Sequence, residues 1–93
     1  MSLISEESIA KREKDRLARK AQIALTQTQQ FEDELSTHEL NQLRLDALPI
    51  EKHDEKWTLA RDVAVSSIDT LNHAIEITLI EIDTIETELK ADS

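Results

Sequence analysis

The sequence predicts an all-α protein, a long antiparallel helical hairpin with the character of a coiled coil. Three observations support this fold class. The chain has no glycine and one proline, Pro49; apolar residues recur every three or four positions; and basic and acidic residues gather in different parts of the chain. Strand-rich folds need turns with positive φ, which glycine adopts at the least cost. A chain without glycine most simply forms long helices joined by very few connections.

The length of 93 residues suits one small domain. We expect residues 1–93 to form a single helical-hairpin domain. In it, a first helix covers about 5–47, a connection covers about 47–49, and a second helix covers about 50–90. At this size one core is only marginally stabilising, and association with a partner often supplies the rest.

The first helix has a clear start signal. Ser5 can cap its first turn with a hydroxyl, and two acidic residues follow at once. The stretch LSTHEL, residues 35–40, reads as a capping box with a hydrophobic staple, so the helix could break near Ser36. We favour a continuous helix, in which the apolar stripe reaches Leu40 and Leu43 after a small phase slip.

The second helix must be distinguished from a strand, because AIEITLIEIDTIETEL (residues 74–89) alternates in part. A run of 16 residues is too long for an average strand of about 5–6 residues. The neighbours Leu79 and Ile80 also break the alternation, so we predict a helix. Pro49 suits its first turn; a later start, after His53 with Asp54 as the cap, is the alternative. Its heptad stripe contains Trp57, Arg61, Ala64, Ile68, Leu71, Ile75, Thr78, Ile82, Ile85 and Leu89.

The charge distribution predicts how the helices are oriented. The net charge of −9 divides into +2 over residues 1–30, −4 over 31–61 and −7 over 62–93. An antiparallel fold with a connection at 47–49 places the basic run 11–20 beside residues 76–85. The pairs expected in that register are Ala10 with Ile85, Ala21 with Ile75, Ala24 with Leu71, Phe31 with Ala64, and Trp57 with His38 and Leu40.

Two sets of apolar residues follow from this arrangement. The second helix carries more apolar surface than one neighbour can bury, so we expect a further helix, from a second copy or a different protein, to cover the excess. The predicted intrachain seam is Leu17, Ala21, Ala24, Phe31, Ile68, Leu71, Ile75, Ile82, Ile85 and Leu89. The predicted partner interface is Leu59, Val63, His73, Ile77 and Ile80.

No motif predicts catalysis, a cofactor or a metal site. The chain has no cysteine and no glycine-rich phosphate loop. It also lacks the Glu-x-x-His spacing with which helix bundles hold metals. We expect its three histidines at the solvent or an interface. The basic run is interrupted by Glu13 and Asp15 and has no flanking aromatic residues, which disfavours nucleic acid as a partner. Overall acidity disfavours an anionic membrane as well.

We therefore expect a non-catalytic protein–protein interaction module: an assembly or adaptor protein, a scaffold or a chaperone-like subunit, with no small-molecule substrate. A cytoplasmic location is expected, because no signal peptide and no run of about 20 apolar residues is present. The alternative is an acidic inhibitor that mimics nucleic acid. Its charge density is low, since a net −7 over about 48 Å of helix compares with one charge per about 1.7 Å of duplex DNA. A small helical enzyme or metal protein is the third hypothesis.

Overall fold

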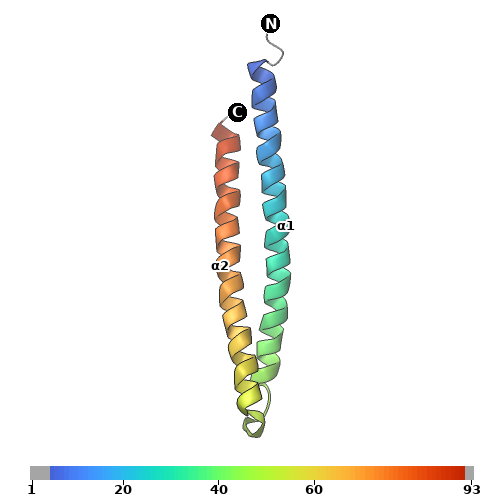
Figure 1. Cartoon of the computed structure of the whole chain (residues 1–93), viewed down its shortest axis with the longest axis vertical. Helices are drawn as coiled ribbons and strands as arrows, with labels where there is room; N and C mark the ends of the chain where they lie inside the picture. The colour runs from blue at the N-terminus through green and yellow to red at the C-terminus, as the bar shows by residue number, and fades with distance from the viewer. Residues whose placement is uncertain (1–4, 92–93) are drawn as a thin grey trace.

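The computed structural model describes residues 5–91. It contains helix α1 (Glu6–Asp46), a short 3-10 helix η1 (Ile50–Lys52) and helix α2 (Glu55–Ala91). α1 and α2 run antiparallel and lie side by side as a long rod (Figure 1). The 41 residues of α1 span about 60 Å. The predicted fold class, an all-α antiparallel hairpin, is confirmed.

α1 is one uninterrupted helix. The Ser5 hydroxyl accepts a hydrogen bond from the Ser8 backbone N–H at 3.2 Å, which caps the first turn. The helix passes through Ser36 without a break, so the favoured continuous helix is confirmed. Next to Ser36, the Thr37 hydroxyl donates to the Asp33 carbonyl at 3.2 Å, one turn back within the same helix.

The connection is longer than predicted, and the expected start of the second helix near residue 50 is wrong. Pro49 is extended, with φ −64° and ψ 153°, and precedes η1 instead of opening α2. α2 begins at Glu55 because the Asp54 carboxylate accepts the Trp57 backbone N–H at 2.9 Å. The alternative start after His53 is therefore the one that the structure adopts.

The longer connection shifts the register of the two helices. The predicted connection placed residue 62 beside Glu34, whereas Glu34 lines a hollow together with Thr70 of α2. The pKa of Arg16 is raised mainly by its hydrogen bond with Glu13 and to a smaller extent by the negative charge of Glu88 across the hairpin. The expected residue pairs, such as Ala21 with Ile75, are therefore wrong by about two helical turns. The expected orientation is confirmed, because the basic run lies beside the acidic end of α2 (Figure 1).

The seam between the helices follows a regular heptad on both sides. Every non-exposed residue of α1 falls on one series with spacings of three and four, from Lys14 to Leu45. This series continues through His38 and Gln42, so the predicted phase slip is wrong and Leu43 is 67% exposed. Of the ten predicted seam residues, the buried ones are Leu17, Ala24, Leu71, Ile82 and Ile85, and the half-buried ones are Ala21, Phe31, Ile68, Ile75 and Leu89.

Candidate protein–protein interface

A second apolar stripe lies on the side of α2 that faces away from the seam. Ile77 is 53% and Ile80 is 60% exposed, and Leu59, Val63 and His73 are exposed as well. These five residues are the predicted partner interface. Their spacings of four, ten, four and three keep them on one side of a helix. The structure therefore places them on one uncovered side of α2 in two groups, Leu59 with Val63 and His73 with Ile77 and Ile80, about 15 Å apart along the helix.

This stripe is part of a longer surface without formal charge, which we call the outer strip. The acidic residues of this part of α2 lie instead in a separate row at intervals of seven: Asp62, Asp69, Glu76 and Asp83. That acidic row borders the outer strip on one side only. The outer strip consists of Leu59, Ala60, Val63, Ser66, Ser67, Thr70, His73, Ala74, Ile77 and Ile80.

On its other side, the outer strip borders a groove between the two helices. Two hollows of about 330 Å³ and about 290 Å³ lie there and share His38. The α2 residues that line the groove are mostly small, including Ala60, Ala64 and Ser67, and the larger Val63 and Leu71 lie beside them. Glu34 and Asn41 line it from α1. A groove beside an uncharged helix face is a shape into which a further helix can pack closely.

His38 is a groove residue that the sequence did not reveal. It is half-buried on the seam, where the sequence predicted a solvent or interface histidine. The next two seam residues after His38 are Gln42 and Leu45, of which only Leu45 is apolar. A seam through the exposed Leu40 and Leu43 would have contained more apolar side chains. Unbroken heptad spacing was the only signal that could have placed His38 correctly.

α1 adds a second uncharged stretch at the middle of the rod. Residues 21–31 contain no Asp, Glu, Lys or Arg. Within this stretch Ile23 and Leu25 are exposed. The middle of α1 is therefore free of formal charge, whereas the stretches on either side of it, 11–20 and 32–39, are highly charged.

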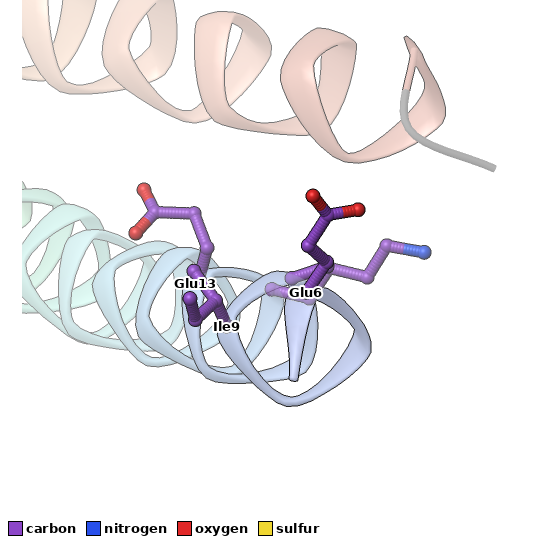
Figure 2. A pocket seen from close by; sticks show the side chains of 5 residues that line it. Glu6, Ile9 and Glu13 are labelled. Atoms are coloured by element: carbon purple, nitrogen blue, oxygen red, sulfur yellow. The ribbon is translucent and has the colours of Figure 1, made fainter. Parts of the chain in front are cut away.

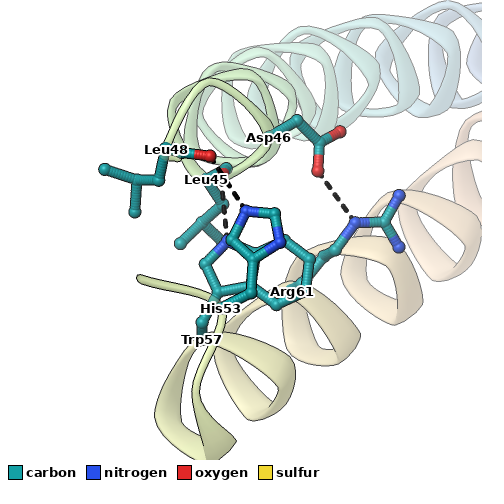
Figure 3. A network of polar contacts seen from close by, with 6 residues as sticks. All are labelled: Leu45, Asp46, Leu48, His53, Trp57 and Arg61. Atoms are coloured by element: carbon teal, nitrogen blue, oxygen red, sulfur yellow. Dashed lines mark hydrogen bonds and ion pairs between the residues drawn. The ribbon is translucent and has the colours of Figure 1, made fainter. Parts of the chain in front are cut away.

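The closed end of the hairpin holds a compact polar network (Figure 3). The Trp57 indole N–H donates to the Leu45 carbonyl at 2.8 Å, and its ring stacks on His53 with centroids 3.7 Å apart. His53 Nε2 donates to the Leu48 carbonyl at 2.9 Å, since a carbonyl oxygen can only accept. Arg61 binds Asp46 at 2.9 Å. These contacts hold the connection against both helices.

At the open end, α1 extends beyond the last turn of α2 (Figure 1). Glu6 and Glu13 extend from α1 toward α2, and with Ile9 they line an open hollow of about 470 Å³ (Figure 2). Glu13 accepts two hydrogen bonds from Arg16, and these lower the pKa of its carboxyl group. The hollow is lined by α1 residues only, so it is a surface recess and not a built binding site.

Within residues 5–91, no set of three or more His, Asp or Glu side chains is placed to hold a metal ion. No helix in that range has the length and apolarity needed to cross a membrane. The outer strip and the adjoining groove are the most distinctive surface on the hairpin.

Comparison with protein-family models, with curated proteins and with solved structures finds no match to this chain. The surface must therefore be interpreted from its own residues.

Proposed function

We propose that this hairpin is a non-catalytic interaction module that binds a helical surface through the outer strip. The observation that supports this proposal most directly is the composition of the strip. Over about 20 residues of α2 it carries no formal charge, and its largest side chains, among them Ile77 and Ile80, are more than half exposed. Large exposed apolar side chains on an uncharged helix face are typical of a site of protein interaction.

The energetics favour covering this surface. Fully burying an isoleucine or leucine side chain contributes about 1.5–3 kcal/mol, and Ile77 and Ile80 retain more than half of that surface in contact with water. The small residues Ala60, Ser67 and Ala74, which form the groove-side border of the outer strip, allow a partner helix to approach closely. The acidic row along one border would discourage acidic partners and so contribute to specificity. An assembly, adaptor, scaffold or chaperone-like subunit would use a surface of this kind.

The nucleic-acid mimic has less support. Its charges would come from the acidic row, in which neighbouring residues such as Asp69 and Glu76 are seven positions apart, or about 10 Å along the helix. Duplex DNA carries one charge per about 1.7 Å. The exposed isoleucines of the outer strip would have no role in such a mimic.

The test is site-specific photo-crosslinking in cells that produce the chain among its natural neighbours. A photo-reactive amino acid replaces Thr70, in the outer strip, or Asn72, an exposed polar residue of the same helix beyond the acidic row. We expect a protein adduct from position 70 and little from position 72. Because apolar burial is barely weakened by salt, the adduct should persist at about 1 M salt.

Two matched sets of variants distinguish the outer strip from the face of α2 beyond the acidic row. Ile77→Glu combined with Ile80→Glu should remove the adduct from position 70. Leu79→Glu, next to Ile80 in sequence but beyond the acidic row, should leave it in place. Absence of an adduct from position 70, or equal adducts from positions 70 and 72, would contradict the proposal.

A further inference from the structure

We propose that the partner of the outer strip is a second copy of this chain, packed antiparallel, with a two-fold axis close to Gln27 and Ile77. This inference rests on the proposed function, in which the strip is an interface, and it adds the identity and orientation of the partner. It follows from the charge pattern of α1, the heights of residues along the rod and the area of the face.

The charges along α1 are complementary to those along a second α1 that runs in the opposite direction. Residues 11–20 contain six basic and two acidic side chains, for a net charge of +4. Residues 21–31 contain no charged side chain, and residues 32–39 contain four acidic and no Lys or Arg side chains, for −4. An antiparallel second copy places each basic stretch on the partner's acidic stretch. A parallel copy would place like charges together, which is unfavourable.

Most of these charges have no ion-pair partner within residues 5–91. In the part of the chain that the structure describes, the ion pairs are Glu13 with Arg16 and Asp46 with Arg61. The acidic residues of 32–39 take part in neither. Their charges therefore remain available to a partner.

Residues on the groove side of α1 define the register in which the two copies would pair. Glu34 lines the groove, and Gln27 and Lys20 precede it by one and two heptads, so all three lie on the same side of α1. Gln27 is midway between the basic and the acidic residue. A two-fold axis at Gln27 therefore places Lys20 of each chain opposite Glu34 of the other.

The same two-fold axis also brings α2 of one copy against α2 of the other copy. Glu34 of α1 and Thr70 of α2 line the same hollow of the groove; Gln27 lies seven positions before Glu34, and Ile77 lies seven positions after Thr70. Gln27 and Ile77 are thus at the same height on the rod. Ile77 then meets its own symmetry mate, and Thr70 comes opposite Thr84. The acidic row lies on the far border of the strip and so outside this contact, whereas Glu81, one heptad after Ala74, lies on the groove border within it and comes opposite His73 of the other copy.

The available area is large enough for a stable dimer. Two helices, each about 10 Å wide and in contact over about 50 Å, present a face of about 1,000 Å² per chain. Stable interfaces typically bury about 800 Å² per partner. The hairpin can therefore dimerise without any additional segment.

Cysteine crosslinking tests the orientation, because the chain contains no cysteine of its own. With a short bis-maleimide, Gln27→Cys should crosslink to itself. Glu13→Cys and Asn41→Cys should each fail to do so alone but crosslink when the two variants are mixed, since an axis at Gln27 brings these positions together. Self-crosslinking of Glu13→Cys and Asn41→Cys would show a parallel dimer and overturn the inference.

Charge reversal tests the register. Sedimentation at low salt should show that Lys20→Glu and Glu34→Lys each weaken the dimer about tenfold, because both symmetry-related pairs become repulsive. The double variant should recover the affinity to within about twofold. Lys11→Glu, on the flank of α1 away from the groove, is the matched control and should change the affinity less than about twofold. Failure of the double variant to recover would overturn the proposed register.

The photo-crosslinking adduct from position 70 separates the two proposals. An adduct that contains a second copy supports both. An adduct that contains only a different protein, together with a purified chain that stays monomeric, overturns the antiparallel dimer and leaves the interaction module standing. A monomeric chain with no adduct overturns both.

Discussion

Trp57 is the residue that ties the two helices together at the closed end. It belongs to the seam of α2, donates to the Leu45 carbonyl near the end of α1, and stacks on His53 in the connection. Arg61 lies with its guanidinium 6.0 Å from the Trp57 ring centroid. One side chain therefore contacts three segments of the chain, which suits a turn that has no glycine to shape it.

Replacement of Trp57 by phenylalanine tests this role. The Trp57→Phe variant keeps an aromatic ring against His53 but loses the donor to the Leu45 carbonyl. We expect a loss of about 1 kcal/mol in the free energy of unfolding, since the Leu45 carbonyl loses the indole donor and keeps the Leu48 backbone N–H. Urea denaturation followed by circular dichroism measures this change. An unchanged midpoint would show that the indole hydrogen bond does not stabilise the closed end.

At the scale of the helices, the two halves of the seam differ in polarity. α2 contributes mostly isoleucine and leucine, whereas α1 contributes Thr28, His38 and Gln42 among its ten positions. Buried hydroxyls are satisfied locally, because Thr28 donates to the Ala24 carbonyl at 2.9 Å and Thr78 to the Ala74 carbonyl at 2.8 Å. The seam thus contains no unsatisfied hydroxyl, but it buries less apolar surface than its length would allow.

A more apolar seam should therefore be more stable. Gln42→Leu places a large apolar side chain at a half-buried seam position, with almost no change in helix propensity. We expect a gain of about 1 kcal/mol in the free energy of unfolding. Gln29→Leu, at an exposed position of the same helix, is the matched control and should give almost no gain. Equal effects of the two variants would contradict the observed seam.

At the scale of the whole molecule, two helices can bury only part of each other's apolar surface. Each buries one narrow face, so thirteen large apolar side chains are exposed among residues 5–91. Seven of them lie toward the closed end: Leu40, Leu43, Leu48, Ile50, Leu59, Val63 and Val65. Five lie near the middle of the rod: Ile23, Leu25, Ile77, Leu79 and Ile80. Association through the outer strip would remove part of this apolar surface from water.

If two copies associate, the stability of the hairpin must depend on its concentration. Because binding stabilises the folded state by mass action, we expect the midpoint of thermal unfolding to rise with protein concentration. Ile77→Glu with Ile80→Glu should remove this dependence, and Leu79→Glu should preserve it. A midpoint independent of concentration in the unmodified chain would contradict self-association.

The sequence by itself determined the helices and most of the seam. Heptad spacing is a local property of the chain, so all ten positions of the α2 stripe, from Trp57 to Leu89, could be assigned without knowledge of the rest. The exposure of Ile77 and Ile80 follows from the same spacing. The antiparallel orientation followed from the unequal distribution of charge.

Only the tertiary structure decided the register of the helices and the path of α1 near its end. Register depends on where the connection ends, which the Asp54 cap and the contacts of Trp57 with Leu45 determine. These contacts join residues that periodicity does not relate. The seam passes through His38 and Gln42 instead of the more apolar Leu40 and Leu43, because a partner helix on a straight rod selects a continuous geometric face even where another face is more apolar.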